Sequence, residues 1–112
     1  MNYWLSLILI SICLANSAIA KTYKGSELRK MVSVGKYPKV GNPKTETQTM
    51  SFETCRLAIA MAISQVEGAL PTEVLVNTNL LYIAKIWLND SQTVLSCSNP
   101  DSMFTTVTSS YR

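Results

Sequence analysis

Residues 51–68 have the sequence SFETCRLAIAMAISQVEG. Apolar side chains recur in this stretch at steps of three and four residues, which is the spacing of one face of an α-helix. Ser51 is a typical N-cap residue, and Gly68 is typical of the position just after a helix end. The stretch therefore predicts the main amphipathic helix of the fold, which extends through Glu67. Its apolar stripe comprises Phe52, Cys55, Ile59, Ala62, Ile63 and Val66.

After Pro71 the sequence changes to runs of β-branched and aromatic residues, which favour strands. Asn89-Asp90-Ser91 is the clearest hairpin turn between two of these runs, and residues 98–101 predict a second turn. The most economical arrangement is one main amphipathic helix packed on an antiparallel β-meander, so the predicted fold class is α+β. The predicted strands of the meander are residues 73–76, 80–88, 93–97 and 103–108.

The charge of the chain divides it into two parts. Residues 21–44 hold seven basic residues and one acidic residue, a net charge of +6, whereas residues 45–112 hold three basic and six acidic residues, a net charge of −3. Asn42-Pro43 favours an extended backbone that closes the basic segment. We therefore expect a basic amino-terminal arm over residues 21–44 and a single α+β domain over residues 45–112, with its first short strand at residues 45–50.

The basic arm is expected to contain a short helix. Ser26 is a suitable N-cap residue, and Gly35 is placed to end the helix. Three apolar side chains share one face at helical spacing, which indicates ordered structure rather than a random basic tail. These side chains are Leu28, Met31 and Val32.

Residues 1–20 predict a secretory signal peptide. An apolar run is followed by small residues, and Ala18 and Ala20 form a typical cleavage site before Lys21. The run is too short to span a hydrocarbon core of roughly 30 Å. No Lys or Arg precedes it, so an uncleaved anchor stays open as the alternative. We expect a periplasmic or secreted protein with no integral membrane span after cleavage.

Two cysteines, Cys55 and Cys97, follow the predicted cleavage site, and Cys13 precedes it. In an oxidising compartment an even pair is normally bridged. The alternative is a reactive thiol, but the sequence has no C-x-x-C motif and no His to lower a thiol pKa. We predict a Cys55–Cys97 disulfide that joins the start of the main helix to a strand.

The composition excludes several kinds of active site. The chain of 112 residues has no His, which rules out His-based triads and His-ligated zinc. The acidic residues form no recognisable catalytic pair, and neither a calcium loop nor metal-ligand spacing occurs. We therefore expect a non-catalytic protein with no metal and no cofactor. Nucleic acid is not an expected partner, because an exported chain meets little of it and the arm has only two aromatic residues for stacking.

The candidate binding residues lie in the arm and in one predicted strand. Lys36, Tyr37 and Lys39 belong to the cationic arm, whereas Lys85 and Trp87 share the strand face opposite the predicted helix. An exposed tryptophan is a typical anchor of a protein interface. Two structural alternatives remain. In the first, the cations only form a solvated face. In the second, the arm covers the tryptophan in a second small core through Leu28, Met31 and Val32.

Four short motifs carry a resemblance to other proteins. They are GKYP at residues 35–38, FxxC at residues 52–55, KIWLND at residues 85–90 and LSCS at residues 95–98. Through them the chain resembles small exported, disulfide-bridged proteins of unknown function from Gram-negative bacteria, some of which travel with conjugative or mobile elements. The resemblance implies a periplasmic or secreted location and supplies no catalytic residues.

Together these observations predict an exported, non-catalytic accessory or binding protein of the bacterial cell envelope, linked to a transfer or secretion apparatus. The expected partner is an envelope protein or an anionic envelope component. A small secreted effector or enzyme inhibitor is the alternative, because the size, the disulfide and the basic arm suit it equally. A eukaryotic secreted module, in which Asn89-Asp90-Ser91 is a glycosylation sequon, is a third possibility.

Overall fold

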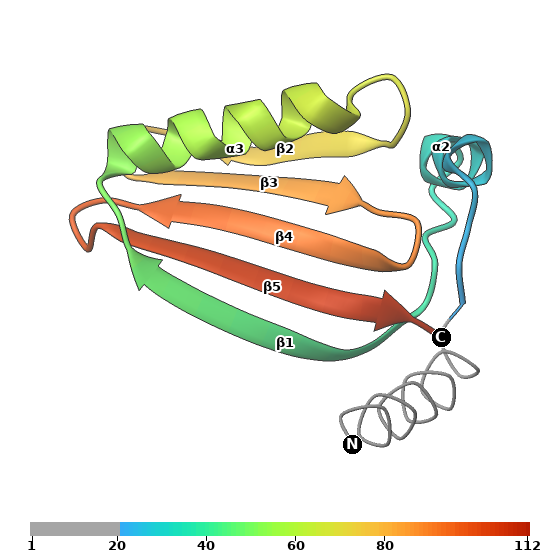
Figure 1. Ribbon diagram of the computed structural model, residues 1–112. Coiled ribbons are helices and arrows are strands. Elements are labelled where there is room, and N and C mark those ends of the chain that lie inside the picture. Colours follow the sequence, from blue (N-terminus) through green and yellow to red (C-terminus); the bar gives the residue numbers. More distant parts are fainter. Residues whose placement is uncertain (1–20) are drawn as a thin grey trace, which may run out of the picture.

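The computed structural model describes residues 21–112 and confirms the α+β class. The predicted signal peptide at residues 1–20 lies outside the described residues. Within residues 21–112 the fold has two helices and a five-stranded antiparallel sheet (Figure 1). Neither helix is long and apolar enough to cross a membrane. In chain order the elements are α2 (Gly25–Ser33), β1 (Val40–Thr49), α3 (Phe52–Val66), β2 (Thr72–Asn77), β3 (Leu81–Trp87), β4 (Ser91–Ser98) and β5 (Met103–Tyr111).

The sheet has the strand order β1-β5-β4-β3-β2. Strands β2 to β5 form the predicted meander, and β1 pairs antiparallel with the last strand, β5. The chain therefore leaves one edge of the sheet after β1, passes along α3, and enters the opposite edge as β2. Figure 1 shows α3 covering one face of the sheet and α2 lying at one end of it.

Strand β1 begins at Val40, earlier than the predicted start at Thr45. The backbone at Asn42-Pro43 is extended, as expected, but these residues do not close the basic segment, because both belong to this strand. Proline has no N–H to donate, but an edge strand tolerates it, since only one side of the strand pairs. The pairing with β5 is irregular between Val40 and Pro43, where the strand register shifts. The arm consequently continues into the sheet without a break at residue 44.

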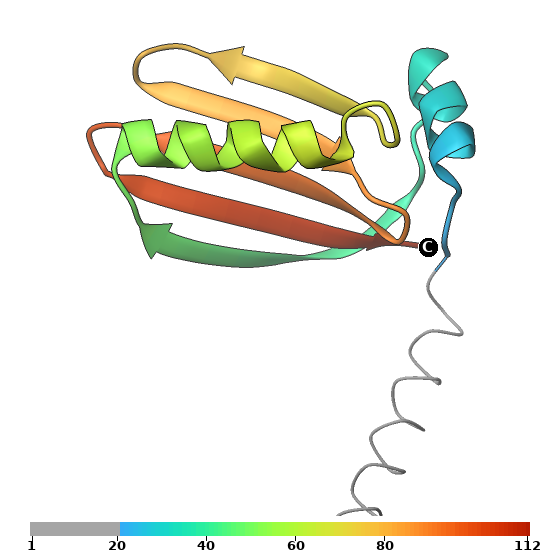
Figure 2. The ribbon, with the colours of Figure 1, turned by 45° about the horizontal axis from the view of Figure 1, so that its top comes forward.

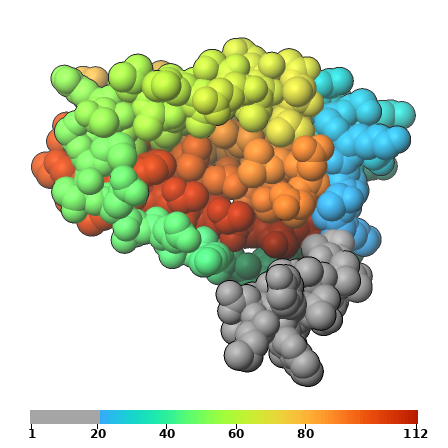
Figure 3. Space-filling view, in the orientation of Figure 1, coloured from blue at the N-terminus to red at the C-terminus, as the bar shows by residue number. Residues whose placement is uncertain are grey.

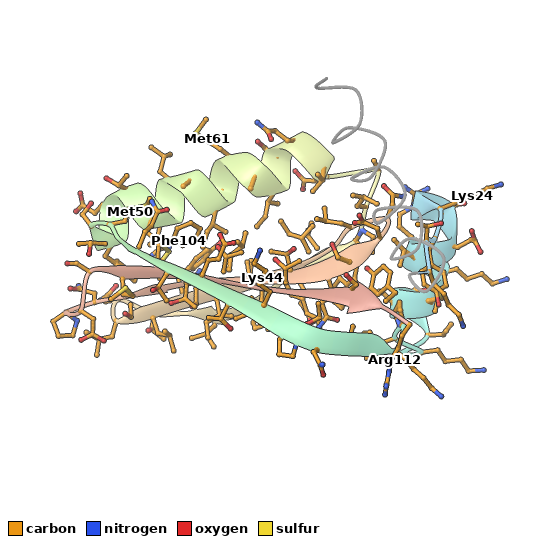
Figure 4. The ribbon with its side chains drawn as sticks, turned by 60° about the horizontal axis from the view of Figure 1, so that its bottom comes forward. Lys24, Lys44, Met50, Met61, Phe104 and Arg112 are labelled. Carbon is orange, nitrogen blue, oxygen red and sulfur yellow. A yellow bond between two sulfur atoms is a disulfide. The ribbon has the colours of Figure 1, made fainter. Side chains whose placement is uncertain are left out.

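Helix α3 follows the predicted pattern closely. Ser51 caps it, and its Oγ accepts a hydrogen bond from the Thr54 N–H at 3.3 Å. Cys55 and Ile59 of the apolar stripe are fully buried against the sheet, and the rest of the stripe packs around them. In Figure 4 Met61 points away from the sheet, whereas Met50 and Phe104 lie near the first turn of α3. The main core therefore lies between one face of α3 and one face of the sheet.

The predicted Cys55–Cys97 disulfide is present. Both cysteines are completely buried, and their Cα atoms are 5.8 Å apart. The bond joins the first turn of α3 to β4, so it fixes the helix to the centre of the sheet. It lies in the core with Tyr82, Ala84, Ile86 and Leu95.

Helix α2 starts one residue before its predicted cap. Lys24, rather than Ser26, is the N-cap, and its N–H donates to Glu27 Oε1 at 3.0 Å. At the other end the Gly35 N–H donates to Val32 O and the Lys36 N–H donates to Met31 O, which is the Schellman arrangement of a helix end. Gly35 has a φ of +75°, a conformation in which a side chain would be strained.

Side-chain and backbone hydrogen bonds attach the arm to two loops of the rest of the molecule. Arg29 Nη1 donates to Gly68 O at 2.6 Å and to Ala69 O at 2.9 Å, in the loop that follows α3. Tyr23 exchanges two hydrogen bonds of 2.8 Å with Asn89, in the turn between β3 and β4. Figure 3 shows the arm in blue against the orange atoms of the β3–β4 region. The arm is therefore a folded cover over one end of the sheet.

Candidate functional site

Three of the five sequence-predicted binding residues meet in the structure. The Tyr37 ring stacks on the Trp87 ring, with centroids 5.7 Å apart and an angle of 11° between the ring planes. Lys85 Nζ lies 4.8 Å from the centroid of the Trp87 ring and 5.5 Å from that of Tyr37. Such distances are typical of cation–π contacts. The arm and strand β3, which are far apart in the sequence, thus build one cluster.

Lys36 and Lys39 are exposed on either side of Tyr37 along the chain. Within residues 21–112 neither of them forms an ion pair, and nor does Lys85, although Glu73 lies opposite Lys85 on the neighbouring strand β2. The Tyr37 side chain is 52% exposed. We call Lys36, Tyr37, Lys39 and Lys85 the Tyr37 surface. It presents to solvent an aromatic ring with the Lys85 ammonium beside it and two exposed lysines close to it along the chain.

Trp87 is not part of that exposed surface. Of the two interpretations of Trp87, the one with an exposed indole is wrong, because the side chain is only 1% exposed. It forms a second core with Leu28 and Tyr111, against which Tyr23 and Val32 also pack. The arm covers the tryptophan from α2, as in the alternative with a second small core. Its Nε1 is buried with no hydrogen-bond partner in the described part of the chain.

The sheet face that carries Lys85 lies opposite α3, and α2 packs against it at the end that carries Trp87 (Figure 1). In-register neighbours such as Val94 and Val107 lie beside Lys85 on this face. Beyond this end, the apolar residues on the face are partly exposed. We call this surface the open face. Its apolar members are Val76, Leu81, Ile83, Val94, Met103 and Val107.

A second candidate site, which the sequence reasoning missed, lies on the helix side of the sheet. A groove of about 670 Å³ runs between α3 and two turns at one end of the sheet. Arg56 is its only basic residue. The Arg56 guanidinium lies 4.9 Å from the centroid of the Tyr82 ring and 5.6 Å from that of Phe52. The other lining residues are Glu53, Leu57, Ala60, Asn79 and Asn99.

One signal in the sequence points to this groove. Arg56 is the only basic residue of the predicted helix, and it follows Phe52 by four residues, so both side chains lie on one side of α3. The asparagines come from turns, and only the folded chain brings these turns next to the helix. In residues 21–112 no group of three or more His, Cys, Asp or Glu side chains is placed to hold a metal ion.

Comparisons of the chain with protein-family models, with curated proteins and with solved structures found no match.

Proposed function

We propose that the protein is an exported, non-catalytic binding protein of the bacterial cell envelope, and that it holds an anionic partner at the Tyr37 surface. The observation that carries the proposal is Tyr37 itself, a half-exposed ring that stacks on the buried Trp87 and has the Lys85 ammonium 5.5 Å from its centroid. Lys36 and Lys39 lie close to it along the chain. Aromatic rings supply contact energy in interfaces, and cations attract an acidic partner. The open face continues this surface and offers further apolar contact area.

In this proposal Trp87 acts as a positioning residue. It is buried, so it supports the Tyr37 ring from below instead of contacting the partner. In this proposal α2, the short helix of the arm, packs over the end of the sheet. The main helix, α3, packs on the sheet face opposite Lys85. This packing brings Tyr37, which lies between Lys36 and Lys39 in the sequence, next to Lys85. Without it the arm would be a flexible basic tail.

The proposed location follows from the cysteines and from residues 1–20. A buried disulfide is typical of oxidising compartments such as the periplasm. The sequence of residues 1–20 has the features of a cleaved signal peptide. The resemblance to exported proteins of mobile elements is the basis for expecting the partner within a transfer or secretion apparatus.

The proposal is tested by photo-crosslinking in the native envelope. A photoreactive amino acid replaces Tyr37, and the crosslinked product is identified by mass spectrometry. The same group at Met61, an exposed side chain on the outer side of α3, is the control position. We expect an adduct with an acidic envelope component from position 37 and no such adduct from position 61.

Charge reversal then tests the role of the lysines. Lys36→Glu with Lys39→Glu should reduce the adduct most strongly at low salt, because exposed charges are screened over about 10 Å at 0.1 M salt. Lys21→Glu with Lys24→Glu makes the same change in net charge at exposed positions outside the Tyr37 surface. Equal loss in both variants would contradict the site. Recovery of the protein from the medium instead of the periplasm would favour a secreted effector.

A further inference from the structure

The groove beside Arg56 lies on the opposite side of the sheet from the open face. Its walls are the first half of α3 and the turns that follow β2 and β4. Figure 2 shows the β2–β3 hairpin extending past α3, which leaves this strip of the sheet uncovered by the helix. The volume, about 670 Å³, lies in the range of small-ligand sites.

The orientation of the Arg56 guanidinium is fixed on several sides. Its carbon lies over the Tyr82 ring, and its Nη2 donates a hydrogen bond of 3.0 Å to Asn77 Oδ1. Phe52 contributes a second aromatic contact from the preceding helical turn. A guanidinium held in this way loses little freedom when it binds a ligand.

Most of the hydrogen-bonding capacity of Arg56 is unused. A guanidinium has five N–H donors, and Arg56 donates one hydrogen bond in the part of the chain that the structure describes. The guanidinium forms no ion pair within those residues, although Glu53 also lines the groove. A partly buried guanidinium with free donors favours an anion.

We propose that the groove binds the free carboxylate at the carboxyl terminus of a peptide, with Arg56 as the residue that holds it. A carboxylate matches the two parallel donors of a guanidinium. One cation with a carboxylate on the rim suits a ligand with a single negative charge better than a phosphate. Asn79 and Asn99 line the groove and supply amide groups for the peptide backbone, although the Asn99 Nδ2 also donates a hydrogen bond of 3.4 Å to Asn79 O. Leu57, 63% exposed, offers an apolar contact to a side chain.

The test is a titration of the isotope-labelled, oxidised protein with acetyl-alanylalanine, followed by nuclear magnetic resonance. The carboxyl-terminal amide of the same peptide is the matched neutral probe. We expect saturating shifts at the Asn79 and Asn99 side-chain amides with the free acid, and at least tenfold weaker binding of the amide. Equal binding of the two probes, absence of saturation in the millimolar range, or equally tight binding of inorganic phosphate would overturn the proposal.

Variants then separate charge from geometry. Arg56→Gln should abolish binding, and Arg56→Lys should weaken it about tenfold, because an ammonium keeps the charge but loses the fork of donors. Glu53→Gln should strengthen binding a few-fold by removing the rim carboxylate. Lys85→Gln, on the opposite face, should bind as the wild type does. If Arg56→Gln fails to fold, the titration of Arg56→Lys with the free acid and with the amide decides. A free-acid affinity equal to that of the wild type would then also overturn the assignment.

Discussion

Gly25 lies where the first turn of α2 meets the loop after α3. A Cβ atom at this position would stand 2.3 Å from Ala69 O, a backbone atom that cannot move aside freely. We expect Gly25→Ala to lower the free energy of unfolding by about 1 to 3 kcal/mol, the usual cost of overpacking. Urea denaturation followed by circular dichroism measures this change.

Gly41 provides the matched control for that substitution. A Cβ atom there would lie 3.5 Å from Ser110 O, which is ordinary contact distance. Gly41→Ala should therefore change the unfolding free energy by less than about 0.5 kcal/mol. If the two variants proved equally stable, the close packing of α2 on the loop would not contribute to stability.

Tyr111 connects the last strand to the second core. Its hydroxyl donates a hydrogen bond of 2.7 Å to Leu88 O, and its ring packs edge-on against Tyr23 with centroids 5.2 Å apart. Burial raises the pKa of Tyr111 well above its ordinary value, and the nearby Asp90 and Tyr23 raise it further. In the unfolded chain the pKa of the same phenol is roughly 10.

This difference predicts a loss of stability at alkaline pH. The folded state keeps its Tyr111 proton at a pH where the unfolded state releases it. The contribution of Tyr111 to the free energy of unfolding is therefore complete below about pH 10 and falls as the pH rises further. We expect the unfolding free energy of Tyr111→Phe to depend less on pH between about pH 9 and pH 11. Parallel stability curves for the wild-type protein and Tyr111→Phe would contradict the prediction.

Among the elements, α3 and β4 are connected covalently as well as by packing. The Cys55–Cys97 bond closes a sequence separation of 42 residues, and on the chain-entropy model it stabilises the fold by on the order of 4 kcal/mol. Cys55→Ala with Cys97→Ala should lower the unfolding free energy by a comparable amount in urea denaturation. The reduced wild-type protein serves as the control, and it should lose stability similarly. A double variant as stable as the oxidised protein would show that packing alone holds α3.

The elements differ in how far the sequence predicted them. The apolar stripe of α3 and the strands of the meander were predictable, because each depends on a local period and on local turn residues. The start of β1 was not predictable, since Pro43 indicates a break by itself and lies in a strand only because β5 offers a partner on one side. The prediction of Ser26 as the N-cap of α2 was wrong for a similar reason. The helix begins at Gly25, which packs closely against Ala69, and only the folded chain forms this contact.

At the scale of the whole molecule, the arm and the end of the sheet form one unit. The backbone N–H of Lys21 donates to Tyr111 O at 3.3 Å, so a chain beginning at Lys21 keeps every contact described above. We predict that the exported protein starts at Lys21, because Ala18 and Ala20 are the small residues that a signal peptidase requires. Amino-terminal sequencing and intact mass of periplasmic material check this. A mature protein that retains residues 1–20 would contradict cleavage and favour the anchor.

The two candidate surfaces face away from each other. The Tyr37 surface and the open face lie on one side of the sheet, and the Arg56 groove lies on the side of α3. A substitution in one surface should therefore leave ligand binding at the other unchanged, because sites that share no contacts act nearly independently.

The sequence by itself determined the main helix, the strands of the meander and the covalent bond of this protein. Helical and strand periods, the cap at Ser51 and the single cysteine pair after the predicted cleavage site are local or combinatorial features, and they needed no knowledge of the fold. The tertiary structure alone decided that Trp87 is buried beneath Tyr37 and that Arg56 lies beside two turns distant in sequence. Such contacts depend on which surfaces meet when the arm and α3 pack on the sheet, and that choice depends on shape and burial across the whole chain.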